Sequence, residues 1–259
     1  MAKYNKLQDK HVLVIGGSAG IGKAVAAASL EAGARVTISS SSKARLDSAV
    51  RELQSSTGAV GQRISGIAID LSAKDTIETN LEQLFQSAKQ AGPVDHVVYT
   101  AGDSIPMTPL SEFQPAQAHA AIQLRMIAPL MVAKVAVRHL PSTRASSLTL
   151  TGGTLSERPA KGLAIASFLC GGIQAVTRAL AVEMAPVRVN MVRPGLVDTG
   201  LLDGLGAEAK KSWMESVEAT VPTGKVGQVE DVAEAYLWSM KDGNASGTVA
   251  GTDGGLLVV

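Results

Sequence analysis

Cysteine is nearly absent from the sequence, and neither sign of charge is in excess. The single cysteine, Cys170, cannot form a disulfide within the chain, which excludes a disulfide-stabilised secreted scaffold. Lysine and arginine number 24 and aspartate and glutamate number 23, so the formal net charge is +1. Because a nucleic-acid-binding protein shows an excess or a stripe of basic residues, no nucleic-acid partner is expected.

Long apolar segments are also missing. No run of about 18 uncharged apolar residues occurs, so a membrane span is not expected. The N-terminus has no apolar stretch that could serve as a signal peptide. The histidines, His11, His96, His119 and His139, are scattered and suggest neither a metal site nor a catalytic triad. These absences predict a cytoplasmic globular protein without a bound metal.

Apolar runs with strand character alternate with longer segments of helical period. Strands are expected at residues 11–15, 35–39, 64–69, 95–100, 146–151 and 187–192. Helices are expected at residues 23–32 (closed by Gly33), 43–56, 73–90, 115–140 and 163–184. This order predicts one α/β domain over residues 1–259, with a doubly wound, Rossmann-like parallel sheet and helices on both faces.

A glycine cluster, Gly16-Gly17-Ser18-Ala19-Gly20-Ile21-Gly22, follows the first expected strand. At a strand-to-helix turn, a missing Cβ lets the backbone approach a pyrophosphate, which then meets the positive end of the next helix. The spacing is Gly-x-x-x-Gly-x-Gly rather than the general Gly-x-Gly-x-x-Gly fingerprint. The cluster therefore predicts a dinucleotide-binding turn.

This spacing resembles that of the short-chain dehydrogenase/reductase family, and further motifs extend the resemblance along the chain. Asp70-Leu71 resembles the family's adenine contact, and Thr100-Ala101-Gly102 resembles its Asn-Asn-Ala-Gly motif. The segment 189–195, followed by Thr199, resembles the part that holds the nicotinamide, and 252–255 resembles the C-terminal Asp-Gly-Gly. The resemblance implies cofactor contacts from Gly16, Ser18, Gly20, Ile21, Gly22, Ser40, Ser41, Ser42, Lys43, Asp70, Leu71, Ala101, Gly102, Arg125, Thr151, Pro194, Gly195, Val197 and Thr199.

The end of the second expected strand bears on the choice of cofactor. A site selective for NAD places a carboxylate here to accept hydrogen bonds from the ribose 2′-hydroxyl. The sequence has Ser39-Ser40-Ser41-Ser42, followed by Lys43 and Arg45, which suit an anion instead. NADP(H) is therefore expected in preference to NAD(H).

The residues that members of the family use to reduce carbonyls are missing at the matching positions. The resemblance assigns the tyrosine position to Ala166, the lysine position to Cys170 and the serine position to Gly152 or Gly153. The asparagine position falls on Arg125, or on Gln123 if the register slips. Since general acid catalysis contributes about 10²–10⁴ in rate, an ordinary ketone or alcohol dehydrogenase is not expected.

Hydride transfer to an iminium or similar cation gives a neutral product and needs no proton donor. Arg125 is the candidate for facing this site, where its planar fork could hold a carbonyl, a carboxylate or the cofactor ribose. The alternative is that Arg125 simply pairs with a carboxylate or with the cofactor. Glu157 is the nearest candidate acid after the fifth strand, and a solvated loop residue is the other interpretation. Cys170 is not expected to be a nucleophile, because no histidine is near it in the sequence.

The empty catalytic positions, Arg125 and the serine-rich second strand resemble those of a small fungal branch of the family. The resemblance implies action in prenylated indole alkaloid pathways of the malbrancheamide and paraherquamide type, by NADPH reduction of a cationic intermediate coupled to an intramolecular Diels–Alder cyclisation. Two alternatives remain open: a cofactor-independent cyclase or isomerase on the same fold, and a catalytically silent binding protein. A reductase with a relocated acid is a further possibility.

A variable segment at about 196–218 is expected to form a lid over a hydrophobic substrate. Leu201, Leu202, Leu205, Trp213 and Met214 would give this lid an apolar inner face, and Met107 and Met126 would line the opposite wall. By family resemblance, the helices at 115–140 and 163–184 pair across a dimer axis, and the Asp-Gly-Gly tail joins a second interface. A homodimer or homotetramer is therefore expected.

Overall fold

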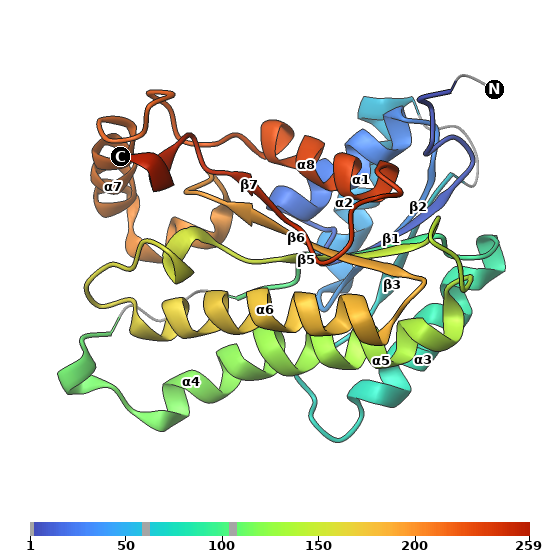
Figure 1. Cartoon of the computed structure of the whole chain (residues 1–259), viewed down its shortest axis with the longest axis horizontal. Coiled ribbons are helices and arrows are strands. Elements are labelled where there is room, and N and C mark those ends of the chain that lie inside the picture. Colours follow the sequence, from blue (N-terminus) through green and yellow to red (C-terminus); the bar gives the residue numbers. More distant parts are fainter. Residues whose placement is uncertain (1–2, 59–62, 104–107) are drawn as a thin grey trace.

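Seven parallel strands form one sheet in the order β3-β2-β1-β4-β5-β6-β7, shown in Figure 1. The computed structural model describes residues 3–58, 63–103 and 108–259. The strands are β1 His11–Ile15, β2 Arg35–Ser40, β3 Ile64–Ala68, β4 His96–Tyr99, β5 Ser147–Thr151, β6 Arg188–Pro194 and β7 Val249–Thr252. The doubly wound parallel sheet predicted from the sequence is confirmed.

Helices cover both faces of the sheet and close a hydrophobic core on each (Figure 1). The helices are α1 Gly20–Glu31, α2 Lys43–Thr57, α3 Ile77–Ala88, α4 Pro115–Ile122, α5 Ala128–His139, α6 Ala164–Glu183, α7 Ala207–Glu218 and α8 Val229–Lys241. Helices α1, α2 and α8 pack on one face, and α3, α5 and α6 pack on the other. Each core buries both helix and strand side chains, so the chain folds as one domain.

The observed elements differ from the predicted ones in the middle of the chain and toward its C-terminal end. The helix expected at 115–140 is divided by a π-helical turn at Gln123–Ile127, which separates α4 from α5. The elements α7, α8 and β7 were not predicted. Strand β7 has four residues at the edge of the sheet and none is buried, so it lacks the apolar run by which the other strands are recognised.

All the strands end at the same edge of the sheet, because every neighbouring pair is parallel. Chain connections run outward in opposite directions from β1 and β4, which lie next to each other at the centre. In open α/β sheets this switch point is where a crevice forms at the carboxyl ends of the strands. The segments after β1, β2, β4, β5 and β6 therefore meet at this carboxyl edge.

Two helices are long and apolar enough to cross a membrane by length and composition alone. They are Ala118–His139, with mean hydropathy 1.6, and Ala164–Glu183, with mean hydropathy 1.5. Charged residues interrupt both helices, so neither is an uninterrupted apolar run. Both contribute side chains to the core beneath the sheet, a role that demands the same composition in a globular α/β domain.

Candidate active site

The glycine-rich turn between β1 and α1 is packed tightly against the end of β4. A Cβ atom on Gly16, whose φ is +92°, would lie 2.5 Å from the backbone nitrogen of Ala101. A Cβ on Gly22 would lie 2.3 Å from the Gly16 carbonyl oxygen and 2.4 Å from Oγ1 of Thr100. Only glycine fits these positions, and no side chain caps the first turn of α1. The free backbone N–H groups at this helix start fit a pyrophosphate.

Serine side chains join this turn to the end of β2. The Ser18 hydroxyl donates to Oγ of Ser40 across 2.9 Å, and the backbone N–H of Ser42 lies 3.4 Å from the same oxygen. Ser42 caps α2 by accepting from the Arg45 N–H at 3.3 Å. Lys43 pairs with Asp47 one turn along α2, at 2.5 Å and 2.6 Å to its two carboxylate oxygens. The structure brings hydroxyls and cations together beside the turn, as a phosphate-binding loop requires.

The segment after β3 is fixed by its own side chains. Asp70 accepts hydrogen bonds from the backbone N–H and the hydroxyl of Ser72 at 2.8 Å and 2.7 Å, which lower the pKa of its carboxyl. Asn80 donates to the Asp70 carbonyl at 3.0 Å, and Gln123 Nε2 lies 3.4 Å from the carbonyl of Leu71. Leu71 itself is buried in the core beneath the sheet. The carboxylate of Asp70 is thus committed to the turn, and the backbone is left to contact a cofactor.

Arg125 lies against the end of β4. It comes from the π-helical turn, and its guanidinium sits on Gly102, where a Cβ would be 2.9 Å from Nη2. Its Nη2 donates to the carbonyl of Asp103, and its Nε lies 3.4 Å from Oδ1 of the same residue. In the structure Arg125 is thus paired with Asp103.

Gly153, Cys170 and Arg125 converge at the carboxyl edge from three separate segments. A Cβ on Gly153 would lie 3.1 Å from Sγ of Cys170. Burial raises the pKa of the Cys170 thiol, and the nearby positive charge of Arg125 lowers it by a smaller amount. Ala166, one turn before Cys170 on α6, is buried. Because none of these side chains is a tyrosine, lysine or serine, the cluster offers no ordinary proton donor for an alkoxide.

The hydroxyl groups of Tyr99 and Tyr236, the two tyrosines in the core, are both hydrogen-bonded. The Tyr99 hydroxyl donates to the carbonyl of Leu124, and that of Tyr236 lies 2.7 Å from Oγ1 of Thr151. Burial raises the pKa of both phenols above the ordinary value. Thr151 also donates to the Tyr99 carbonyl at 2.7 Å, so it ties β5 to β4. Neither tyrosine has taken over the vacated acid position.

Glu157, the acid singled out from the sequence, is held in an ion pair. Arg193 Nη1 contacts its carboxylate, and Arg193 Nη2 lies 3.7 Å from Oδ2 of Asp253. The Arg158 guanidinium donates to the Leu256 carbonyl. These contacts tie the loop after β5 to the C-terminal segment. The arrangement makes Glu157 a positioning group for that loop.

The segment after β6 is held to the end of β7. The Gly195 N–H donates to the Thr252 carbonyl at 3.0 Å, extending the pairing of Pro194 with Thr252. Val197 forms a parallel bridge with Gly227. Thr199 caps the following 3-10 helix, Gly200–Leu205, by accepting from the Leu201 N–H. These residues line the carboxyl edge next to the glycine turn, where a Cβ on Gly20 would be 3.4 Å from Cγ2 of Thr199.

The segment expected to form a lid contains the 3-10 helix Gly200–Leu205 and α7, and charged groups connect the two. Lys210 lies 3.1 Å from Asp198 and 2.9 Å from Asp203, and hydrogen bonds to these carboxylates raise its pKa. No residue of α7 is fully buried, Leu202 and Trp213 are half-buried, and Leu201 is exposed. A mixed polar hollow, lined by Lys210, Met214, Glu215 and their neighbours, lies along α7. The apolar inner face expected for the lid is therefore only partly formed.

Of the two methionines expected to line the wall opposite the lid, the structure describes only Met126. Met126 packs against α6, where a Cβ on Gly172 would meet its Cε at 2.6 Å, and it joins the core beneath the sheet. Met107 lies outside the residues that the structure describes.

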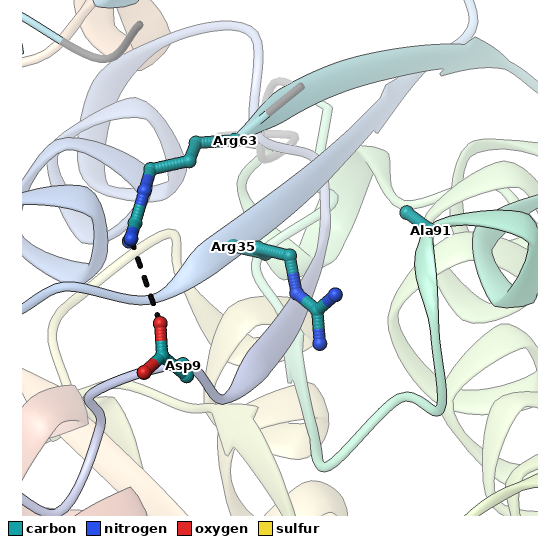
Figure 2. Close-up of a pocket in the computed structure, with 4 residues that line it drawn as sticks. All are labelled: Asp9, Arg35, Arg63 and Ala91. Atoms are coloured by element: carbon teal, nitrogen blue, oxygen red, sulfur yellow. Dashed lines mark hydrogen bonds and ion pairs between the residues drawn. The ribbon is translucent and has the colours of Figure 1, made fainter. Parts of the chain in front are cut away.

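A second hollow, of about 400 Å³, is lined by Asp9, Arg35, Arg63 and Ala91 (Figure 2). Arg35 begins β2, so this hollow lies at the amino edge, away from the glycine turn.

Sequence reasoning missed two charged residues that the structure places at this edge. Asp103 directly follows the Thr100-Ala101-Gly102 motif, so its proximity to a bound cofactor could have been inferred from the motif. Lys210 carries no local signal, because its partners Asp198 and Asp203 precede the helix on which it lies. Among the described residues, no group of three metal-ligating side chains comes together.

The whole chain is similar to known short-chain dehydrogenases/reductases. An SDR-like Rossmann domain family model matches residues 3–259. The chain is 41% identical over 251 residues to short-chain dehydrogenase/reductase ATR9 of Stachybotrys chlorohalonatus, covering 96% of this chain and 97% of that protein. It is 35% identical over 253 residues to short-chain dehydrogenase/reductase malC of Malbranchea aurantiaca, with coverages of 97% and 96%.

Comparison with solved structures points to the same family. The MalC reductase/Diels-Alderase from Malbranchea aurantiaca superposes with a TM-score of 0.93 at 34% identity, covering 99% of both chains. A small-chain dehydrogenase in complex with NADPH gives a TM-score of 0.76 at 26% identity, covering 97% of this chain and 100% of the other. The glycine turn, the open start of α1 and these matches agree on a nicotinamide-nucleotide fold. The chain belongs to the short-chain dehydrogenase/reductase family of oxidoreductases.

Proposed function

We propose that this protein is an NADP(H)-dependent reductase that transfers hydride to a pre-activated, iminium-type hydrophobic substrate. The observation that carries the proposal is the composition of the cluster at the carboxyl edge. The positions that resemble the family's tyrosine and lysine hold Ala166 and Cys170. The serine position holds Gly152 or Gly153, and the asparagine position holds Arg125 or Gln123. Since this cluster supplies no proton to an alkoxide, the electrophile must be one whose reduction requires none.

An iminium carbon meets this requirement. When bound, the nicotinamide cofactor supplies a hydride. As the new C–H bond forms, the π electrons of the C=N bond move onto nitrogen, and the cation becomes a neutral amine. The protein's task is then to position the two reactants and to exclude water. The lid and the residue cluster at the carboxyl edge can do this without a proton relay.

The preference for NADP(H) rests on the end of β2. A 2′-phosphate here would meet Ser40, Ser41 and Ser42 rather than a carboxylate, with Lys43 and Arg45 on the first turn of α2. Lys43 is paired with Asp47, an exposed contact of small energetic value that a phosphate can displace. The backbone N–H groups at the start of α1 would hold the pyrophosphate, and Gly195 to Thr199 would lie beside the nicotinamide.

The similarity to the MalC reductase/Diels-Alderase supports a second activity. The overall match to this protein extends the proposal to an intramolecular Diels–Alder cyclisation of the reduced product, in indole alkaloid biosynthesis. Such a cyclisation needs a shaped, water-poor pocket and no acid. We place the enzyme in the cytoplasm.

The exposed faces of α5 and α6 support a homodimer or homotetramer. Phe168 is 56% exposed and Val182 78% exposed on α6, and Val137 is 51% exposed on α5. Large apolar side chains gathered on neighbouring helices mark a protein contact surface. A second copy of the chain would cover them and would account for the apolar composition of both helices.

Deuterium transfer tests the proposal. The purified protein is incubated with NADPH deuterated at the transferable position and with either an N-methyl dihydroisoquinolinium salt or acetophenone. The expected result is deuterium in the tertiary amine and none in an alcohol, with NADH at least about tenfold less effective. No binding of either nucleotide would leave the cyclase or the binding protein as the function. Deuterated alcohol from acetophenone would instead reveal a relocated acid.

A further inference from the structure

The charge of Arg125 would oppose a cationic substrate if nothing compensated it. The guanidinium is fixed on Gly102 and electrostatically close to Cys170, so it lies inside the cluster at the carboxyl edge. An unpaired guanidinium repels a second cation that is bound in the same partly buried cluster. A site for an iminium ion therefore needs an anion next to Arg125.

Asp103 is this anion. Its carboxylate Oδ1 lies 3.4 Å from Arg125 Nε, and its carbonyl accepts a hydrogen bond from Arg125 Nη2. Two contacts to one residue fix the position of Asp103 relative to the arginine. The carboxylate offsets part of the charge of Arg125 and lies at the end of β4, next to the expected cofactor site.

The pair leaves hydrogen-bonding capacity unused. Asp103 Oδ1 and Arg125 Nε are both buried, and neither makes a hydrogen bond with a described residue, because their 3.4 Å approach lacks the required alignment. The Asp103 side chain is 42% exposed, against 22% for Arg125. Asp103 is therefore the more accessible member of the pair, and Arg125 is the more buried one.

Other described carboxylates along this edge have committed partners. Asp70 accepts from Ser72, as described above, and Glu157 pairs with Arg193. Asp198 and Asp203 both pair with Lys210. Asp253 accepts from the Gly255 N–H. Asp103 differs from them because its partner is the arginine of the cluster itself.

From this geometry we infer that Asp103 is a specificity-determining residue that selects a cationic electrophile over a neutral one, and that Arg125 is the positioning residue that holds it. The inference deepens the proposed function and rests on it. Burying a cation without a counter-ion is costly, so a carboxylate at the mouth of the cluster lowers that cost for an iminium ion. A neutral ligand of the same shape receives no such benefit.

The test uses two probes of equal shape. N-methyl dihydroisoquinolinium carries a permanent positive charge, and the methyl dihydronaphthalene with carbon in place of the charged nitrogen carries none. Binding of each to the full-length protein is measured by calorimetry, with and without saturating NADP+, which cannot donate hydride. The parent protein is compared with Asp103→Asn, which keeps the shape and removes the charge, and with Asp198→Asn, which removes a carboxylate from the same edge.

The parent should bind the cation at least about tenfold more tightly than the neutral probe. Asp103→Asn should lose most of this preference and leave the affinity for the neutral probe and for NADP+ within about twofold. Asp198→Asn should keep the preference. Equal loss for both probes in Asp103→Asn would mean that Asp103 only anchors its loop, and would overturn the inference, as would a parent without preference. Failure of the proposed function would appear separately, as absent NADPH binding or absent deuterium transfer.

Discussion

Gly153 and Cys170 face each other so closely that a Cβ on the glycine would lie 3.1 Å from the cysteine sulfur. Ala166 precedes Cys170 by one turn of α6 and is buried. These three residues stand at positions where the family resemblance expects a serine, a lysine and a tyrosine.

Restoring those side chains should create a carbonyl reductase. The variant with Gly153→Ser, Ala166→Tyr and Cys170→Lys should reduce acetophenone with NADPH at least about tenfold faster than the parent, since general acid catalysis contributes about 10²–10⁴ in rate. The rate is followed by NADPH absorbance. Gly204→Ser, at a glycine with open space around it, is the control and should leave the rate unchanged. A folded, NADPH-binding triple variant with parental activity would contradict the assignment of these positions.

The end of β2 should decide between the two nicotinamide cofactors. Ser40→Asp places a carboxylate where Ser18 now donates its hydrogen bond, and the negative charge repels a 2′-phosphate. NADPH should bind at least about tenfold more weakly, a difference of about 1.4 kcal/mol, while NADH binds equally or better. Fluorescence titration measures both. Ser55→Asp, at the exposed far end of α2, should change neither affinity; an unchanged preference in Ser40→Asp would place the phosphate site elsewhere.

Two buried histidines should make the protein sensitive to mild acid. Burial lowers the pKa of His96 to about 3, and it also lowers the pKa of His11. In the unfolded chain both imidazoles become protonated as the pH falls through about 6.5, whereas in the folded protein they stay neutral to lower pH. The free energy of unfolding therefore falls as the pH drops below about 6.5. Each histidine contributes a slope of up to about 1.4 kcal/mol per pH unit.

Urea unfolding between about pH 7 and pH 5, where the carboxylates stay ionised, measures this slope. His96→Asn, next to the Ser147 hydroxyl that now lies 2.9 Å from the ring, should reduce it. His119→Asn, on the exposed side of α4, should not. A slope that is the same in the His96 variant and the parent would show that His96 is protonated in the folded state.

Lys210 should keep the lid ordered. Lys210→Met removes the contacts to Asp198 and Asp203, so residues 200–218 should exchange amide hydrogens faster. Mass spectrometry of the exchanged peptides measures the effect. Lys211→Met is the matched control, because that side chain is 75% exposed and lies 3.9 Å from Glu215 within the same helix. Equal protection in the two variants would show that the lid is held by its apolar contacts.

The apolar faces of α5 and α6 should be contact surfaces between copies of the chain. Phe168→Glu puts a charge on the exposed face of α6, and sedimentation should then show a smaller assembly than for the parent. Leu110→Glu, at a side chain that is 77% exposed away from both helices, should leave the mass unchanged. Parent and Phe168→Glu proteins of equal mass would exclude this surface.

The sequence by itself determined the dinucleotide-binding half of the protein. Strand β1, the glycine turn and α1 are contiguous, so spacing and apolar period suffice to recognise them. The missing tyrosine and lysine could likewise be recognised by counting along one helix, since Ala166 and Cys170 share α6. The elements α7, α8 and β7 were missed, β7 because its four residues carry no buried apolar pattern.

Only the tertiary structure decided the partners of the charged groups. Arg125 and Asp103 are 22 residues apart, and Glu157 and Arg193 are 36 apart, so no local pattern links either pair. The parallel sheet brings the ends of β4, β5 and β6 to one edge, and that topology selects which acid meets which base. Glu157, the acid chosen from the sequence, is thereby paired with Arg193, while Asp103 is placed beside the arginine of the active-site cluster.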